Sequence, residues 1–221
     1  MSPAGQLAFD LGHHPALGRE DFMVGPGNGE AVAWIDRWPD WPGPALVVHG
    51  PPGCGKTHLA SVWRARTGAG IVATAQALDA ALDPSSAVSC FVVEGLTADE
   101  DSGLFHLFNR LTERGGHMLL ISREPPARWN DRLPDLMSRL KTALTVAIDA
   151  PDDAMFEAVL VKLFADRQLR VGPEIIAYLV ARMERSFDAA RRLVAAADHA
   201  SLTRARAITV PLIRDILETT V

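Results

Sequence analysis

Short runs of apolar residues alternate with helix-like patterns through the first two thirds of the chain. Between the runs, apolar residues recur with helical spacing, as in residues 104–111. Runs that are almost continuously apolar are typical of a parallel sheet whose two faces are both covered by helices. The pattern therefore predicts an α/β fold with a five-stranded parallel sheet and helices on both faces. The predicted strands are residues 45–48, 70–74, 90–93, 117–122 and 144–148.

The pattern changes after Pro151, where the apolar residues keep helical spacing and no further strand is predicted. Asp152 and Ser186 stand where they can cap helices, because their side chains accept hydrogen bonds from free N–H groups of a first helical turn. Pro173 and Pro211 stand where helices commonly begin. This part of the chain is therefore predicted to be a small domain made of helices alone.

Residues 50–57 match the phosphate-binding pattern G-x-x-x-x-G-K-[ST] at every position. The match lies between a predicted strand and a helix that leads out from Thr57, which is the context that the pattern requires. Backbone N–H groups of the turn would face phosphate oxygens, with Lys56 on the β/γ-phosphates and Thr57 on Mg²⁺. We therefore expect a nucleoside di- or triphosphate to bind here. The matching residues are Gly50, Pro51, Pro52, Gly53, Cys54, Gly55, Lys56 and Thr57.

Two further predicted strands end in polar residues that a nucleotide site would use. One ends in Glu94, which can hold Mg²⁺ together with Thr57, and another ends in Ser122. Ser122 can donate a hydrogen bond near the γ-phosphate, or it can cap its own turn. ATP hydrolysis commonly needs a second acidic group to orient the attacking water. Gly95 stands where that group is expected, so one of the two carboxylate roles is vacant.

Two charged segments are open to two interpretations each. The acidic residues at 99–101 could replace the missing carboxylate, but their spacing is more typical of the start of the next helix. Arg139 lies in the segment just before the last predicted strand. It is either a solvated arginine at the end of a helix or a group that faces the nucleotide of a neighbouring subunit. An arginine supplied in this way accelerates phosphoryl transfer by about 10³ to 10⁵.

Composition narrows the class of protein. The net charge of −5 argues against a nucleic-acid binder, since such proteins normally carry a basic face. The first ten residues lack the basic and apolar regions of a secretory signal, and no stretch is long enough to span a bilayer. The two cysteines, Cys54 and Cys90, suit a reducing cytosol better than a disulfide scaffold. We expect a cytoplasmic globular protein with no membrane association.

Three parts are predicted along the chain. Residues 1–20 lack a periodic apolar pattern and are rich in Gly and Pro, which is typical of a flexible tail. Residues 21–150 would form the nucleotide-binding core, and residues 151–221 the helical lid. Within the tail, Gln6-Leu7-Ala8-Phe9-Asp10-Leu11 forms one short apolar cluster.

Taken together, these segments resemble the DnaA/Hda family of AAA+ proteins. The phosphate loop runs into His58-Leu59, as in the family's G-K-T-H-L, and residues 122–126 are similar to its sensor segment, which ends in a double proline. Residues 136–140 are similar to the L-x-S-R-[LF] box that carries an arginine finger. The hexamer at 6–11 is similar to the Q-L-x-[LF]-x-L peptide that binds the β sliding clamp. The resemblance covers essentially the whole chain.

The resemblance implies a clamp-dependent regulator of replication initiation, found in the cytoplasm and associated with the nucleoid and replisome. Its partners would be the initiator DnaA and the β clamp of DNA polymerase III, without direct sequence-specific DNA binding; self-association is left open. Arg139 would act in trans on DnaA-bound ATP. Clamp binding would use Gln6, Leu7, Phe9 and Leu11. ADP or ATP with Mg²⁺, unless the site holds no nucleotide, would contact residues 50–57, His58, Glu94 and Ser122.

Two departures from the family pattern bear on the chemistry. Where the family usually has an acidic pair, this chain has Glu94-Gly95, so we expect no efficient intrinsic ATPase. Where a lid arginine usually reaches the γ-phosphate, it has Asp188, which disfavours ATP relative to ADP or an empty site. Whether Arg191 or Arg192 compensates is left open. The alternatives are an AAA+ ATPase of the helicase-loader type, and a DnaA- or clamp-binding adaptor whose nucleotide site is vestigial.

Overall fold

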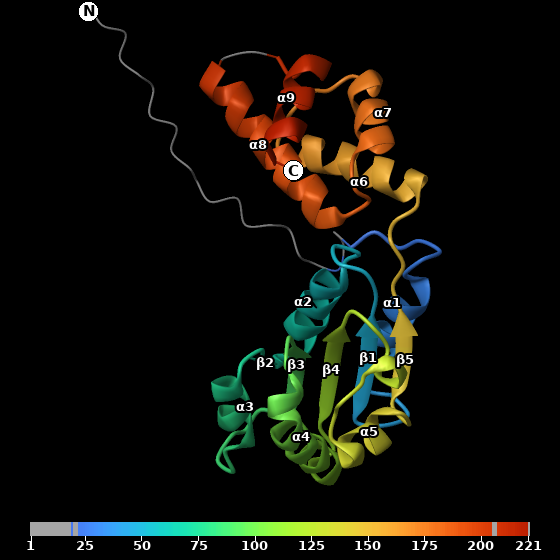
Figure 1. Cartoon of the computed structure of the whole chain (residues 1–221), viewed down its shortest axis with the longest axis vertical. Coiled ribbons are helices and arrows are strands. Elements are labelled where there is room, and N and C mark those ends of the chain that lie inside the picture. Colours follow the sequence, from blue (N-terminus) through green and yellow to red (C-terminus); the bar gives the residue numbers. More distant parts are fainter. Residues whose placement is uncertain (1–18, 20–21, 205–206, 221) are drawn as a thin grey trace, which may run out of the picture. The chain divides into compact units, whose positions relative to one another are not determined.

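The computed structural model describes residue 19, residues 22–204 and residues 207–220. These residues form two compact units, one that ends at Ala150 and one that begins at Pro151. The predicted fold class is confirmed, because the first unit is a parallel sheet with helices on both faces and the second contains helices (Figure 1). None of the described helices is long and apolar enough to cross a membrane.

The described strands of the first unit form one parallel sheet of five strands, in the order β2-β3-β4-β1-β5. Because all strands run in the same direction, the segments that follow them meet at one edge, here called the carboxyl edge. The pairing places His49 of β1 beside Ser122 of β4, and Glu94 of β3 beside Ile121. The strands are β1 (Ala45–His49), β2 (Gly70–Val72), β3 (Cys90–Glu94), β4 (His117–Ser122) and β5 (Leu144–Ala147).

Helices cover both faces of the sheet, and the strand residues alternate between them. Along β1, Leu46 and Val48 pack with helices α1 and α2, whereas Ala45 and Val47 pack with α3, α4 and α5. Both sets are buried, which explains why the strand reads as a continuous apolar run. The helices are α1 (Gly29–Arg37), α2 (Lys56–Thr67), α3 (Ala75–Leu82), α4 (Asp101–Arg114) and α5 (Pro134–Leu140).

A cluster of tryptophans fixes the segment between α1 and β1 against the sheet. Trp41 stacks on Trp63 of α2, with ring centroids 5.4 Å apart and an interplanar angle of 18°. Trp38 and His117 meet this pair edge-on. The indole N–H of Trp41 donates to the Trp34 carbonyl over 2.7 Å. Trp63 is fully buried, so this aromatic cluster is part of the core.

The second unit is a lid domain of helices with its own apolar core. Phe156, Leu160 and Phe164 of α6 are buried in it. The predicted caps are present: Asp152 accepts from the Met155 N–H over 2.8 Å, and Ser186 accepts from the N–H of residue 189 over 3.3 Å. The described lid helices are α6 (Asp153–Asp166), α7 (Pro173–Arg182), α8 (Phe187–Arg204) and α9 (Val210–Thr220).

The predicted elements differ from the observed ones only at their ends. The strand expected to reach Thr74 stops at Val72, because the Thr74 hydroxyl accepts from the Ala77 N–H over 3.2 Å and begins α3. The last strand stops at Ala147, although the N–H of Ile148 still donates to the His49 carbonyl over 2.7 Å. Side-chain caps and single hydrogen bonds therefore decide these boundaries.

Candidate functional site

The phosphate loop leaves β1 at the carboxyl edge and enters α2. Gly50 has a φ of 157°, and a Cβ atom there would lie 2.0 Å from the Ile148 carbonyl oxygen, so no side chain fits. Gly55, directly before α2, has a φ of 105°, which disfavours residues with a side chain. The backbone thus forms a close turn at the positive end of a helix, the arrangement that binds phosphate.

Lys56 directs its ammonium group into this loop. The side chain is buried, and Nζ donates to the carbonyls of Gly50 over 2.8 Å and Pro51 over 2.7 Å. The Cys54 sulfur accepts a longer contact of 3.6 Å. The charge is therefore held where the loop closes around it. A phosphate group in the loop would offer the ammonium oxygen acceptors of the same kind.

Thr57 and Glu94 come together beside the loop. The Thr57 hydroxyl lies in the first turn of α2 and donates to Glu94 Oε1 over 3.4 Å. Glu94 is the last residue of β3, so this hydrogen bond joins the carboxyl end of that strand to the start of α2. A hydroxyl and a carboxylate are oxygen ligands that Mg²⁺ prefers. The two residues fit a cation that also contacts a bound phosphate.

Ser122 and His58 also lie at this end of the core. The Ser122 hydroxyl donates to the Glu124 carbonyl over 2.7 Å, so it caps its own turn in this structure. Its strand position is beside His49, the residue that precedes the loop. The ring of His58 meets the ring of Phe22 edge-on at 5.1 Å. His58 thus helps to anchor the segment before α1 to the start of α2.

The loop and its surroundings carry a positive electrostatic field. Burial lowers the pKa of His49, the charges of Arg128 and Lys56 lower it further, and Asp149 opposes them. Burial raises the pKa of the Cys54 thiol, with Lys56 acting in the opposite direction. Both shifts favour the neutral form of the side chain. The remaining cations favour an anionic ligand at the loop.

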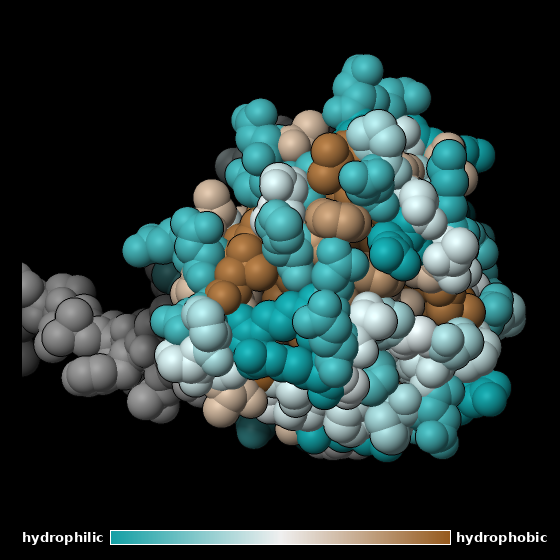
Figure 2. All heavy atoms as spheres, turned by 90° about the horizontal axis from the view of Figure 1, so that it is seen from below, coloured by the Kyte–Doolittle hydropathy of each residue, from teal (hydrophilic) through white to brown (hydrophobic). Residues whose placement is uncertain are grey.

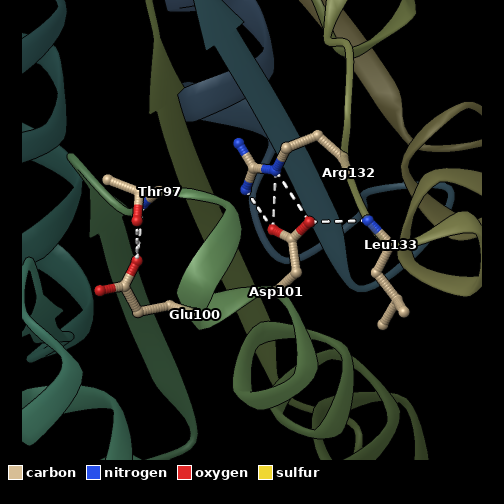
Figure 3. Close-up of polar contacts among 5 residues, drawn as sticks. All are labelled: Thr97, Glu100, Asp101, Arg132 and Leu133. Atoms are coloured by element: carbon tan, nitrogen blue, oxygen red, sulfur yellow. Dashed lines mark hydrogen bonds and ion pairs between the residues drawn. The ribbon is translucent and has the colours of Figure 1, made fainter.

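Two of the acidic residues after β3, Glu100 and Asp101, have structural roles at the start of the next helices. Glu100 accepts from both the N–H and the hydroxyl of Thr97, each over 2.7 Å (Figure 3). Asp101 is buried and forms an ion pair with Arg132. Gly95 has a φ of 74° and carries no side chain. Glu100 and Asp101 are therefore used in a helix cap and an ion pair, and neither replaces the carboxylate that Gly95 lacks.

Arg139 lies in the last turn of α5 and is exposed. In the described part of the chain, no group forms an ion pair or a hydrogen bond with its guanidinium. The helix is held by Leu136 and Leu140, which are fully buried. The helix that carries Arg139, α5, precedes β5 and lies at the edge of the sheet where the strands begin, here called the amino edge, opposite the edge from which the phosphate loop leaves (Figure 1). Arg139 is therefore presented outward and away from its own loop.

The surface at the amino edge is mostly polar. Figure 2 shows the molecule from the side on which α4 and α5 lie in Figure 1. Hydrophilic residues cover most of this face, and hydrophobic ones appear in small separate areas. This character suits a contact made through charged and polar groups.

Two further predictions concern residues that do not belong to the described core. The clamp-binding residues Gln6, Leu7, Phe9 and Leu11 fall outside the described residues. In the lid, Asp188 occupies the first turn of α8 and accepts from Arg191 over 2.5 Å. The guanidinium of Arg191 is thus already paired within the lid.

The sequence did not indicate Arg132. Its partner Asp101 lies 31 residues away, and only the fold brings the two side chains together. The one available signal was the acidic run at 99–101, which pointed to a helix start and not to a partner.

Comparison with solved structures places the fold. Domain III of DnaA from Thermotoga maritima superposes with a TM-score of 0.77 at 17% identity, covering 93% of this chain and 97% of that one. AMPPCP-bound DnaA from Aquifex aeolicus gives a TM-score of 0.67 at 19% identity, covering 86% of this chain and 67% of that one. A RuvB mutant from Thermotoga maritima gives 0.60 at 15% identity, covering 79% and 62%. At sequence identities this low, the structural similarity establishes the fold of the chain and nothing more specific.

Comparison of the sequence with family models and known proteins gives two further matches. Residues 153–217 match the family model described as the lid domain of Hda. An uncharacterized protein of Haemophilus influenzae is 28% identical over 191 residues, which cover 79% of this chain and 81% of that protein. The phosphate loop, the parallel sheet and the helical lid together give the chain the P-loop fold of these solved structures. The chain thus combines a core of DnaA-like fold with a lid that matches the Hda family model, and in both parts it is similar to the DnaA/Hda family of AAA+ proteins.

Proposed function

We propose that this protein is a clamp-dependent regulator of replication initiation that stimulates hydrolysis of ATP bound to DnaA. The Hda-type lid at residues 153–217 and the DnaA-like fold of the core support DnaA as the partner. Proteins built from the same core can face one another through related surfaces. An arginine of one chain can then act at the nucleotide of the next.

The placement of Arg139 carries this proposal. The side chain is exposed, is not held by any described residue, and stands on a helix that two buried leucines anchor. It lies toward the edge of the sheet opposite its own phosphate loop, so it is suited to a partner's nucleotide. A guanidinium group stabilises the charge that develops on the transferred phosphoryl group, which is worth about 10³ to 10⁵ in rate.

The chain's own nucleotide site would hold ADP, or ATP, with Mg²⁺. The loop at 50–57 would bind the phosphates, and Thr57 with Glu94 would hold the cation. The bound nucleotide would supply the negative charge that neutralises Lys56 and the helix end. AMPPCP is bound by the Aquifex aeolicus DnaA of similar fold. We assign the nucleotide here a structural role in ordering the core.

Intrinsic ATP hydrolysis would be weak. Gly95 supplies no carboxylate beside Glu94, and Glu100 and Asp101 are used in a helix cap and an ion pair. Asp188 would disfavour a γ-phosphate, so ADP would be preferred to ATP. The contact between Thr57 and Glu94 is the observation that favours the alternative, an AAA+ ATPase of the helicase-loader type.

Recruitment would depend on the N-terminal segment. An extended peptide can place the amide of Gln6 and the apolar side chains of Leu7, Phe9 and Leu11 in a preformed groove, while only a few residues become ordered. Docking on the β clamp would bring Arg139 to DnaA near replicating DNA. The protein would thus act in the cytoplasm at the replisome.

The test measures turnover of ATP bound to DnaA, with clamp loaded on DNA. Wild type should stimulate turnover, whereas Gln6→Ala and Arg139→Ala should not. Arg170→Ala is the matched control, because Arg170 is an exposed arginine of the lid. If both Gln6→Ala and Arg139→Ala stimulate as well as wild type, the proposal is wrong. If Gln6 is needed and Arg139 is not, the protein is an adaptor.

The same preparation tests the ATPase alternative. The isolated protein should show little turnover without DnaA. Turnover that is efficient and is lost in Lys56→Ala would establish the alternative in its place.

A further inference from the structure

One buried carboxylate joins the starts of helices α4 and α5. Asp101 is the first residue of α4, and only 3% of it is exposed. Its two oxygens accept from Nε of Arg132 over 2.7 and 2.9 Å, and Nη2 of Arg132 completes the pair (Figure 3). The N–H of Leu133 donates to the same carboxylate over 2.8 Å. Both carboxylate oxygens of Asp101 thus accept hydrogen bonds from the segment that leads into α5.

These contacts fix the helix that carries Arg139. Leu133 directly precedes α5, so its hydrogen bond to Asp101 ties the start of that helix to the start of α4. Leu136 and Leu140 hold the inner side of the helix in the core. With its start and its inner side both fixed, α5 holds the backbone position from which the Arg139 side chain extends.

The same pair is connected to both strand ends beside the phosphate loop. From β3, which ends in Glu94, the chain passes through the Thr97–Glu100 cap directly into Asp101. From β4, the Glu124 carbonyl accepts from the indole N–H of Trp129 over 3.0 Å, and the Arg132 guanidinium lies 4.7 Å from the centre of that indole ring. Contacts therefore run from both strand ends to the start of α5.

The Ser122 turn belongs to the second of these connections. The carbonyl of Glu124 accepts from the Ser122 hydroxyl over 2.7 Å as well as from Trp129. If Ser122 turned its hydroxyl toward a phosphate, the Glu124 carbonyl would lose one of its two donors. This loss would alter the hydrogen bond from Trp129 to the Glu124 carbonyl, and with it the position of the indole ring beside Arg132.

We propose that Asp101 and Arg132 form a positioning pair for Arg139, an inference that rests on the proposed function of Arg139. The pair orients α5 and links this orientation to Glu94 and Ser122 at the chain's own nucleotide site. Neither residue touches the partner's ATP. Their effect on the partner passes through the direction of the helix.

The first experiment compares Arg132→Met with wild type in the assay of DnaA-bound ATP turnover on loaded clamp. Arg110→Met is the matched control, because the Arg110 guanidinium also holds a loop of the core. It donates hydrogen bonds to the carbonyls of Ala81, Asp83 and Ser86. Displacement of the finger should lower the turnover rate at saturating protein by about tenfold. The concentration for half-maximal stimulation should stay unchanged, since the clamp-binding segment is intact. Arg110→Met should keep the wild-type rate.

The turnover rate of the Arg132→Met protein decides the proposal. An Arg132→Met protein that is folded by tryptophan fluorescence and stimulates at the wild-type rate overturns the proposal. Should that variant fail to fold, Arg132→Lys serves instead, because lysine keeps the buried charge but cannot form the two parallel hydrogen bonds. Its saturating rate should fall several-fold, and a wild-type rate would again overturn the proposal.

A double-mutant cycle separates positioning from general damage. In an Arg139→Ala background, Arg132→Met should cause no further loss, because there is no finger left to position. A second loss of the same size in that background would overturn the positioning role. If Arg139→Ala alone keeps the wild-type rate, the proposed function fails, whatever Arg132 does.

Discussion

The hydroxyl of Thr57 donates to the carboxylate of Glu94 over 3.4 Å, although 37 residues separate them along the chain. The contact ties the first turn of α2 to the end of β3. It places the two groups expected to hold Mg²⁺ next to each other before any ligand is considered. Gly95, which directly follows Glu94, adds no second carboxylate.

Glu94→Gln should remove most of the Mg²⁺ dependence of ADP binding. The amide keeps the size of the side chain but loses the charge that attracts the cation. We expect the ratio of ADP affinities with and without Mg²⁺ to fall by about tenfold or more. Calorimetric titration in both conditions measures this ratio. Thr57→Ser keeps the hydroxyl and should behave as wild type, whereas an unchanged ratio in Glu94→Gln would exclude this carboxylate from the cation site.

Gly50→Ala should disrupt the phosphate loop. The added Cβ would meet the Ile148 carbonyl oxygen at 2.0 Å, so the loop or the end of β5 has to move. We expect a loss of about 1–3 kcal/mol in the free energy of unfolding of the core, with weaker ADP binding. Chemical denaturation followed by tryptophan fluorescence measures the loss. Gly29→Ala, where a Cβ meets nothing within 4 Å, is the control and should not destabilise the core.

The core should lose stability as the pH falls through about 6.5, the ordinary pKa of histidine. Burial lowers the pKa of His117, which packs against Trp38 and Trp41, and the hydrogen bond with Pro39 opposes this only in part. Below that pH the unfolded chain therefore takes up a proton that the folded chain resists. Burial also lowers the pKa of His49, which contributes with the same sign.

The measurement is the urea midpoint between about pH 7.5 and 5.5. In His117→Gln, which cannot titrate there, the midpoint should fall less than in wild type. Equal slopes for the two proteins would show that His117 is not a source of the pH dependence.

Asp152→Ala should destabilise the lid. The Asp152 side chain accepts from the Met155 N–H over 2.8 Å and so satisfies one free donor of α6. We expect a loss of about 1 kcal/mol, because the substitution removes an N-terminal cap. Thermal unfolding followed by circular dichroism at a helical wavelength measures it. Asp152→Asn keeps a capping oxygen and should lose much less; a loss as large as that of alanine would point to the charge instead of the cap.

Much of the fold could be predicted because its signals are local. The strand, loop and helix around residues 45–67 follow from an apolar run and a glycine pattern that belong to one continuous segment. The caps at Asp152 and Ser186 depend on residues three positions apart. Such features need no knowledge of distant parts of the chain.

The rest depends on tertiary contacts that no local pattern contains. Thr74 reads as a strand residue, yet it begins α3 because its hydroxyl finds the Ala77 N–H. From the sequence, the hydroxyl of Ser122 could either donate to the γ-phosphate or cap its own turn. The structure shows it donating to the Glu124 carbonyl. The functional roles assigned to Arg139 and to the N-terminal hexamer stay predictions, since they concern contacts with other proteins.

The aromatic cluster of the core makes the two units separately observable. All five tryptophans lie in the unit that ends at Ala150, four of them at or beside the stacked pair of Trp41 and Trp63. Emission from these rings therefore reports on the core alone, whereas the helical signal contains the lid as well. A single purified sample can thus show whether ligand binding at the loop stabilises one unit or both, without any attached dye.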